Sequence, residues 1–297
     1  MDVAITGSSG LVGSALANAL HARGDRVVPV LRGSGLGLRW DPAAGVIDAA
    51  GFEGIDAVVH LAGEGIGEKR WTDDQKRTIL ESRVRGTELL AGALAGLTRP
   101  PAVLVSGSAI GWYGNRGDET LTESSAPGPA DDFLVEVCLA WEAATAPAVD
   151  AGIRTVQLRT GIVLSADGGA LARMLTPFKL GLGGRIGSGR QYMSWISMAD
   201  EVGAILHAID TVELAGPVNA TAPTPVTNSE FTAALGHALH RPTKLPTPLL
   251  PLKIVYGAEL VQHLLVDGAR VLPERLQATG YTFAHPTLDV ALAAILS

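Results

Sequence analysis

A glycine-rich turn near the N-terminus constrains the fold more than any other feature of the chain. It follows the apolar residues 3–6 and precedes an Ala/Leu-rich stretch that ends at Gly24, after which residues 26–31 read as a second strand. The whole is typical of a βαβ unit, whose first turn lets backbone N–H groups meet a pyrophosphate at the positive end of a helix. A tight strand-to-helix turn without a ligand is the alternative. The residues predicted to bind a dinucleotide here are Gly7, Ser8, Ser9, Gly10, Leu11, Val12 and Gly13.

The residue that follows the second strand favours NADP(H) over NAD. Sites for NAD usually place Asp or Glu about twenty residues beyond the glycines, where it holds the ribose 2′-OH. This chain has Arg32 there and no acidic residue before Asp41. A guanidinium pairs well with a phosphate, so we expect Arg32 to bind the 2′-phosphate of NADP(H). A solvated loop arginine is the alternative interpretation.

Composition and charge exclude several classes of protein. The 297 residues carry a net charge of −7 and show no basic stripe, so we expect neither a nucleic-acid nor a membrane partner. The single cysteine, Cys138, allows no internal disulfide, and no metal site is expected. No run of 18 apolar residues occurs, and a first strand that begins at Val3 leaves no room for a cleaved presequence. We therefore expect a cytoplasmic monomer or homodimer.

Strand and helix patterns alternate along most of the chain. Strands are predicted at residues 56–63, 102–106 and 155–159, with helices over 72–97 and 132–149, and Ser197 begins a further helix through residue 206. The alternation predicts a Rossmann-type α/β fold with a doubly wound parallel sheet. We expect an NADP-binding domain over residues 1–225, with 165–225 on the substrate side. A small, mainly helical C-terminal domain or cap is expected over 245–297.

The carboxyl ends of the inner strands resemble those of extended short-chain dehydrogenases/reductases. Residues 106–109 read Ser-Gly-Ser-Ala, residues 113–114 read Tyr-Gly, and the glycine turn has the GxxGxxG spacing. In that family a Tyr-x-x-x-Lys pair transfers the proton, and its lysine orients the nicotinamide ribose. None of the four tyrosines here has lysine four residues later. The usual acid/base pair is therefore absent.

This departure, together with motifs along nearly the whole chain, resembles the atypical epimerase-family proteins that end in a small domain of unknown function. The motifs include Leu-Ala-Gly-Glu at 61–64, Lys-Arg-Trp-Thr at 69–72, Asp-Asp-Phe-Leu at 131–134 and Leu-Pro-Glu-Arg-Leu at 272–276. The resemblance implies NADP binding on an extended short-chain dehydrogenase fold, and it supplies no substrate. The further residues expected to contact the cofactor are Leu61, Ala62, Gly63, Glu64, Ser106, Arg159 and Thr160.

Candidates for chemistry come from the remaining polar side chains. Ser108 and Tyr113 are expected to transfer the proton, with Glu64 as the alternative base, and Lys69, Arg70 and Arg190 to hold a polar or anionic substrate. These roles predict an NADP(H)-dependent oxidoreductase acting on a small polar molecule. The alternatives are a non-catalytic NADP(H)-binding redox sensor or scaffold and, less favoured, a nucleotide-sugar epimerase.

Overall fold

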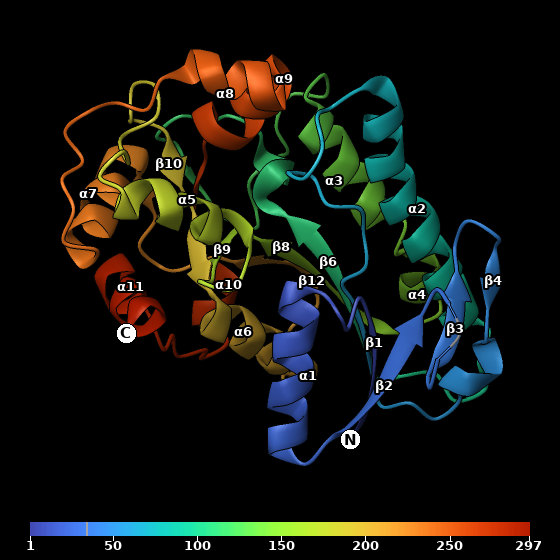
Figure 1. Ribbon diagram of the computed structural model, residues 1–297. Coiled ribbons are helices and arrows are strands. Elements are labelled where there is room, and N and C mark those ends of the chain that lie inside the picture. Colours follow the sequence, from blue (N-terminus) through green and yellow to red (C-terminus); the bar gives the residue numbers. More distant parts are fainter. Residues whose placement is uncertain (34) are drawn as a thin grey trace.

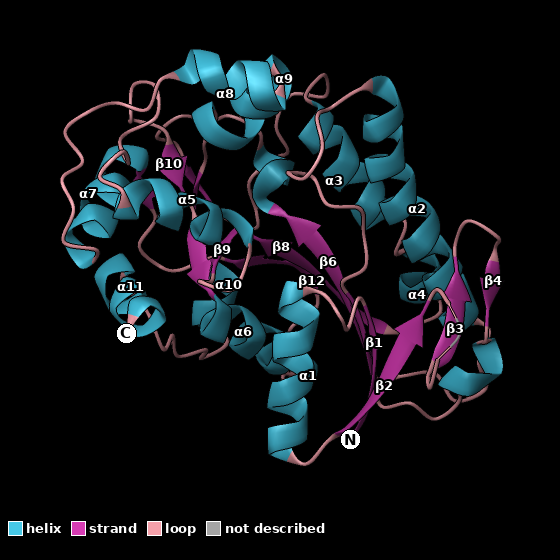
Figure 2. Ribbon diagram, viewed as in Figure 1, coloured by secondary structure: helices cyan, strands magenta, loops and turns pink. Residues whose placement is uncertain are grey.

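The centre of the molecule is a sheet of eight strands, seen in a computed structural model that describes residues 1–33 and 35–297 (Figure 2). In spatial order the strands are β12-β8-β6-β5-β1-β2-β3-β4, and every neighbouring pair is parallel except β3 and β4. From β1 the chain builds β2 and β3 on one side, then returns to place β5, β6, β8 and β12 on the other. This confirms the predicted doubly wound sheet. The strands are β1 (Asp2–Thr6), β2 (Arg26–Leu31), β3 (Leu38–Asp41), β4 (Val46–Ile47), β5 (Ala57–His60), β6 (Val103–Ala109), β8 (Arg154–Thr160) and β12 (Gly216–Ala220).

Helices cover both faces of the sheet (Figure 1). One face packs on α1 (Leu11–Arg23) and α6 (Met198–Asp210), and the other on α2 (Asp73–Ala95), α3 (Phe133–Ala143) and α4 (Ala146–Asp150). Because side chains alternate along a strand, Val3 and Ile5 of β1 enter the first core while Ala4 enters the second. Both faces of the inner strands are therefore buried, as in other parallel sheets.

The remaining elements lie around the carboxyl edge of the sheet and along its β12 side, except η1, which packs with α2 near β3. Their bounds are η1 (Ala49–Phe52), η2 (Ile110–Tyr113), β7 (Thr120–Leu121), β9 (Ile162–Leu164), α5 (Gly169–Lys179), β10 (Tyr192–Met193), β11 (Trp195–Ser197), β13 (Val226–Thr227), α7 (Asn228–Ala238), α8 (Leu249–Tyr256), α9 (Ala258–Val261), the π-helical turn η3 (Gln262–Val266), β14 (Arg270–Val271), α10 (Glu274–Ala278) and α11 (Leu288–Leu296).

The C-terminal region is mainly helical, and its side chains join hydrophobic clusters formed with the rest of the chain. Leu288 and Leu292 of α11 pack with α7, and Leu276 of α10 enters the core beneath α1 and α6. Strand β14 pairs with β7. Part of the predicted substrate-side stretch also belongs to the main layers, since α6 covers the sheet and β12 is its edge strand. We call residues 257–273 the covering segment, because its residues 263–269 line a cavity at the carboxyl ends of β6 and β8.

Candidate active site

The glycine turn has the geometry that a dinucleotide needs. Gly7 has φ +69°, which favours glycine, and a Cβ on Gly13 would lie 2.1 Å from the Gly7 carbonyl oxygen. Helix α1 can therefore pack this closely only with glycine at 13. A Cβ on Gly10 would meet nothing within 4 Å except the Gly7 oxygen at 3.2 Å. The N-terminal turn of α1 carries no acidic residue, so its positive end lies open to an anion.

The turn lies where the strand order reverses, between β1 and β5. A Cβ on Gly7 would lie 3.0 Å from the backbone nitrogen of Ala62, which places the predicted residues Leu61 and Ala62 directly beside it. Thr6, a residue that was not predicted from the sequence, holds the ends of β1 and β5 together. Its Oγ1 accepts hydrogen bonds from the backbone N–H groups of Leu61 (3.1 Å) and Ala62 (3.2 Å). The crevice at such a reversal is the usual ligand site of open α/β sheets.

The polar residues around this crevice are largely paired with one another. The Lys69 ammonium donates to Glu64 Oε1 at 2.8 Å, and this hydrogen bond, more than that from Gln75, lowers the pKa of the Glu64 carboxyl. A lowered pKa disfavours Glu64 as a base near neutral pH. Arg32 is exposed directly after β2, and its charge is among the smaller influences on Glu64.

A cavity of about 230 Å³ lies beneath the covering segment, and one of its lining residues, Arg83, packs beside Gly63 at the crevice. It lies between the carboxyl ends of β6 and β8, helix α3 and residues 263–269, and most of its lining is apolar. Of the predicted cofactor residues, Thr160 lines it. The predicted substrate-binding residues Lys69, Arg70 and Arg190 are exposed and are not among its lining residues. The lining side chains that carry charge or a titratable group are Arg83, Asp132, Cys138, Tyr192, His263 and Asp267.

His263 stands between two carboxylates at the edge of this cavity. Its Nδ1 lies 3.3 Å from Asp267 Oδ2 and 3.6 Å from Asp132 Oδ2, and its ring stacks on Trp71 with centroids 5.7 Å apart. Asp132 is also the N-cap of α3, where Oδ1 accepts from the Leu134 and Val135 N–H groups. Asp267 Oδ1 accepts from Asn115 and Gln262. This group could not be predicted from the sequence, because Asp132 lies about 130 residues before His263 and Asp267 in the chain.

Ser108 and Tyr113 take no part in this cavity, contrary to their expected role in proton transfer. Ser108 is buried and its Oγ donates to Glu142 Oε1 at 2.7 Å, while Tyr113 has no exposed surface. The tyrosine hydroxyl contacts Asn219 Oδ1 at 2.7 Å and the Thr122 carbonyl oxygen at 3.0 Å, and burial raises its pKa. Neither residue lines the cavity, and both side chains lie in the interior.

Arg159 and Ser106 likewise lie inside the protein rather than at the cofactor crevice. The Arg159 guanidinium forms a two-point ion pair with Glu142, at 2.8 and 2.9 Å, and donates to the Tyr113 hydroxyl at 3.0 Å. Its Cζ also lies 3.8 Å from the Trp112 ring centroid. Ser106 is fully buried within β6. These two cofactor predictions do not fit the observed positions.

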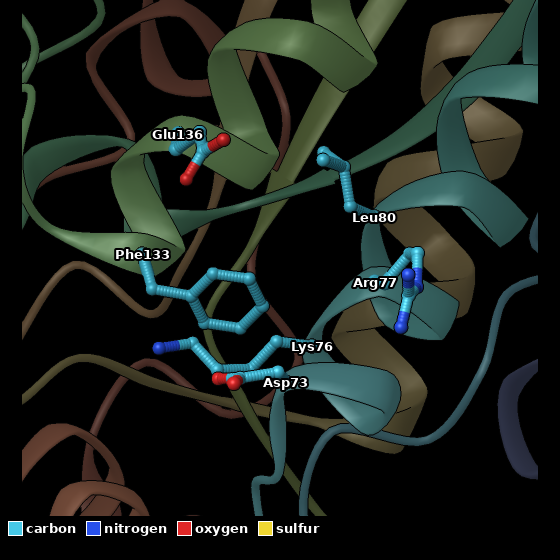
Figure 3. A pocket seen from close by; sticks show the side chains of 6 residues that line it. All are labelled: Asp73, Lys76, Arg77, Leu80, Phe133 and Glu136. Carbon is cyan, nitrogen blue, oxygen red and sulfur yellow. The ribbon is translucent and has the colours of Figure 1, made fainter.

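A second hollow, of about 220 Å³, lies between the first turns of α2 and α3 (Figure 3). Lys76 extends beneath the Phe133 ring, with Nζ 5.0 Å from its centroid, and ion-pairs with Glu259 at 2.6 Å. Arg77 pairs with Asp74. Both cations of this hollow already have carboxylate partners. We therefore interpret the hollow as part of the packing contact between α9 and the helices α2 and α3, and not as a binding site.

Comparison with known proteins identifies the family. The sequence pattern of the NAD dependent epimerase/dehydratase family matches residues 3–220. The chain belongs to this family. A domain of unknown function, DUF1731, matches residues 247–295, so both halves of the predicted family resemblance are confirmed.

Relatives and solved structures match nearly the whole length of this chain. The epimerase family protein Mb2239 of Mycobacterium bovis is 44% identical over 293 residues, 98% of this chain and 96% of the relative. The crystal structure of human epimerase family protein SDR39U1 with NADPH has a TM-score of 0.90, 37% identity and 99% coverage of both chains. A nucleoside-diphosphate sugar epimerase from Corynebacterium glutamicum has a TM-score of 0.81 and 37% identity over all of this chain and 58% of that one.

Two general features complete the description. Within residues 1–33 and 35–297, no helix combines the length and apolar character needed to cross a membrane. In the same residues, no group of three or more His, Cys, Asp or Glu side chains is arranged to hold a metal ion.

Proposed function

We propose that this chain binds NADPH at the glycine turn and reduces a small molecule held in the adjoining cavity. The observation that carries the proposal is the glycine turn at residues 7–13. The space where Gly10 would carry a Cβ is open, and it adjoins the N-terminal end of α1, whose first turn has no acidic residue. The 37% identical human relative, crystallised with NADPH, supports it. The residues that would hold the cofactor are Gly7, Gly10, Gly13, Leu61 and Ala62, with Arg32 at the 2′-phosphate.

The cavity favours a small substrate. Pockets for drug-sized ligands usually enclose about 300–1,000 Å³. This cavity, at about 230 Å³ and beneath the covering segment, is smaller, which disfavours a nucleotide sugar as its occupant. Bound NADPH supplies a hydride for an electrophilic carbon such as that of a carbonyl group.

We further propose that His263 is the proton donor, because it lines the cavity whereas Ser108 and Tyr113 are buried outside it. The two carboxylates orient its ring through Nδ1, which leaves Nε2 without a protein hydrogen-bond partner among the described residues. In reduction of a carbonyl, the oxygen takes the proton from Nε2 as the carbon takes the hydride, and the neutral imidazole then regains a proton from water. A positioned acid typically contributes about 10²–10⁴-fold to the rate.

The cofactor proposal is tested by comparing NADPH and NADH affinities in the wild type and Arg32→Ala. A hydrogen bond to a charged group is worth about 1.5–3 kcal/mol, so the variant should lose about ten- to a hundredfold of any preference for NADPH. Equal affinity for the two cofactors in the wild type would remove Arg32 from phosphate recognition. Arg39→Ala, an exposed arginine on the neighbouring strand β3, serves as the matched control.

The catalytic proposal is tested by NADPH oxidation with a panel of small aldehydes and ketones. His263→Asn should lower kcat by about 10² or more and leave the Kd for NADPH unchanged, because the imidazole acts only in the transition state. His237→Asn, on the exposed face of α7, is the control. No turnover by the wild type across the panel, with NADPH still bound tightly, would favour the redox sensor instead.

A further inference from the structure

The surface formed by residues 179–187 and 241–256 exposes aliphatic side chains to solvent. Helix α8 belongs to it and lies at the margin of the molecule, and none of the residues of α8 is buried (Figure 1). Leu250 and Ile254 are about one helical turn apart on the same side of α8 and are 70% and 67% exposed. Further aliphatic side chains of this surface, each 66–69% exposed, are Leu180, Leu182, Leu245 and Val255. A single exposed aliphatic side chain is ordinary, whereas a group of them usually marks a binding surface.

Contacts between the two stretches bring these side chains into one region. Thr247 forms a β-bridge with Ile186, and its backbone N–H donates to the Arg185 carbonyl oxygen at 2.9 Å. The Arg241 Nε donates to the Lys179 carbonyl oxygen at 2.8 Å. The two stretches therefore lie side by side, although α6 and α7 separate them in the chain.

The same surface is positively charged. Residues 179–187 and 241–256 contain no Asp or Glu, in a chain whose net charge is −7. Their cations are Lys179, Arg185, Arg241, Lys244 and Lys253. Within residues 1–33 and 35–297, none of these cations forms an ion pair with a carboxylate. We call this surface the basic apolar face, and its charge attracts an anionic partner.

The combination of aliphatic side chains and lysines favours a lipid surface as that partner. Helices that bind in the membrane interface place aliphatic side chains at the acyl boundary and basic side chains at anionic headgroups. Protein interfaces are instead enriched in aromatic side chains and depleted in lysine, whereas α8 has Tyr256 as its only aromatic residue. A second copy of this chain is disfavoured as well, because a symmetric contact would bring like charges together.

We propose that the basic apolar face docks this protein on the surface of a membrane that contains anionic phospholipids. Leu250 and Ile254 enter the boundary between headgroups and acyl chains, and Lys244 and Lys253 bind the lipid phosphates. The net charge predicts no membrane partner, because it averages this face with the acidic remainder of the chain. The inference is independent of the proposed reduction and is tested without cofactor or substrate.

The test is sedimentation with vesicles of phosphatidylcholine, alone or mixed with phosphatidylglycerol. The wild type should bind the mixed vesicles and not the neutral ones, and added salt should weaken binding because it screens the headgroup charge. Leu250→Ser combined with Ile254→Ser should lower the partition coefficient by about ten- to a hundredfold, since both side chains lose their burial in lipid. Lys244→Gln combined with Lys253→Gln should lower it by about ten- to thirtyfold.

Matched control variants lie elsewhere on the surface. Val212→Ser removes an aliphatic side chain that is 72% exposed just after α6, and Arg39→Gln removes an exposed cation of β3. Both should bind vesicles like the wild type. Every variant should keep the circular dichroism spectrum and the unfolding midpoint of the wild type, because none of the replaced side chains is buried.

Other results would overturn the inference. Absence of binding to the mixed vesicles, or equal binding by the wild type and both double variants, would exclude this face as a lipid site. Equal binding to neutral vesicles would remove its charge from the recognition. Binding to duplex DNA without binding to vesicles would assign the charge to a nucleic acid instead. A dimer in light scattering that Leu250→Ser with Ile254→Ser converts to a monomer would mean that a second copy covers the face.

Discussion

At the scale of single residues, Arg159 and its partners form a buried polar network. Arg159 of β8 joins Glu142 of α3, and through the Tyr113 hydroxyl it reaches Asn219 of β12. Asn219 Nδ2 then donates to the Leu272 carbonyl oxygen, which links the network to the covering segment. A buried ion pair of this kind is stable only when its remaining donors and acceptors are satisfied. The network therefore fixes how the edge of the sheet meets the C-terminal region.

Tyr113→Phe tests this reading against a catalytic role. The change leaves Arg159 Nη1 and Asn219 Oδ1 without a partner inside the protein, so we expect the free energy of unfolding to fall by about 1–3 kcal/mol. The Kd for NADPH should stay the same. Denaturant unfolding measures the first and fluorescence titration the second, with Tyr256→Phe on the exposed side of α8 as control. Unchanged stability with a large loss of turnover would restore Tyr113 to the mechanism.

At the scale of elements, the helices and strands that depend on neighbouring residues could be predicted from the sequence. Contacts between segments far apart in the chain could not. The glycine turn and the strands of the sheet could be predicted because the residues that form each are neighbours in sequence. The helix predicted over residues 72–97 is α2, and Thr72 caps it by accepting from the Gln75 N–H. Strands β7 and β14 could not be predicted, since each has two residues and pairs across about 150 positions of sequence. The cavity escaped prediction for the same reason.

Ser194→Ala tests how the covering segment is attached. The buried Ser194 Oγ donates to the Ala269 carbonyl oxygen at 2.7 Å and accepts from the Val271 N–H at 2.9 Å. Alanine leaves both backbone groups unsatisfied, at a cost of about 1–3 kcal/mol each. We expect faster limited proteolysis within residues 257–273, located by mass spectrometry. Ser188→Ala, at an exposed serine, should be cleaved like the wild type. Equal protection in Ser194→Ala would mean that other contacts hold the segment.

At the scale of the whole molecule, two buried titratable groups oppose each other in the dependence of stability on pH. Burial lowers the pKa of His60 from 6.5 to about 4, with the charge of Arg83 adding to it. Burial raises the pKa of Glu201 from 4.5 to about 7, against the hydrogen bond from Thr160. His60 Nε2 and Glu201 Oε2 both lack partners among the described residues, so nothing offsets the cost of burying a charge there. With these shifted pKa values, both groups are neutral in the folded protein near pH 6.

The sign of each contribution follows from which state binds more protons. For His60 the unfolded chain binds more protons between pH 4 and 6.5, so stability rises with pH there. For Glu201 the folded protein binds more between pH 4.5 and 7, so stability falls. The two slopes, each about 1.4 kcal/mol per pH unit at most, cancel where the windows overlap. The combined contribution of His60 and Glu201 to stability should thus be nearly constant from about pH 4.5 to 6.5.

Glu201→Gln removes one side of this balance. The amide oxygen can still accept from Thr160, but the side chain no longer titrates, so the His60 contribution stands alone. Burial lowers the pKa of His207 as well, which adds in the same direction. We expect the free energy of unfolding of Glu201→Gln to rise by about 1 kcal/mol per pH unit between pH 4.5 and 6.5. Urea unfolding at pH intervals of one half measures it, with Glu88→Gln on the exposed side of α2 as control. A wild-type profile that rises as steeply as that of Glu201→Gln would show that Glu201 is ionised in the folded protein, and its carboxylate would then require a counterion or water beside Thr160.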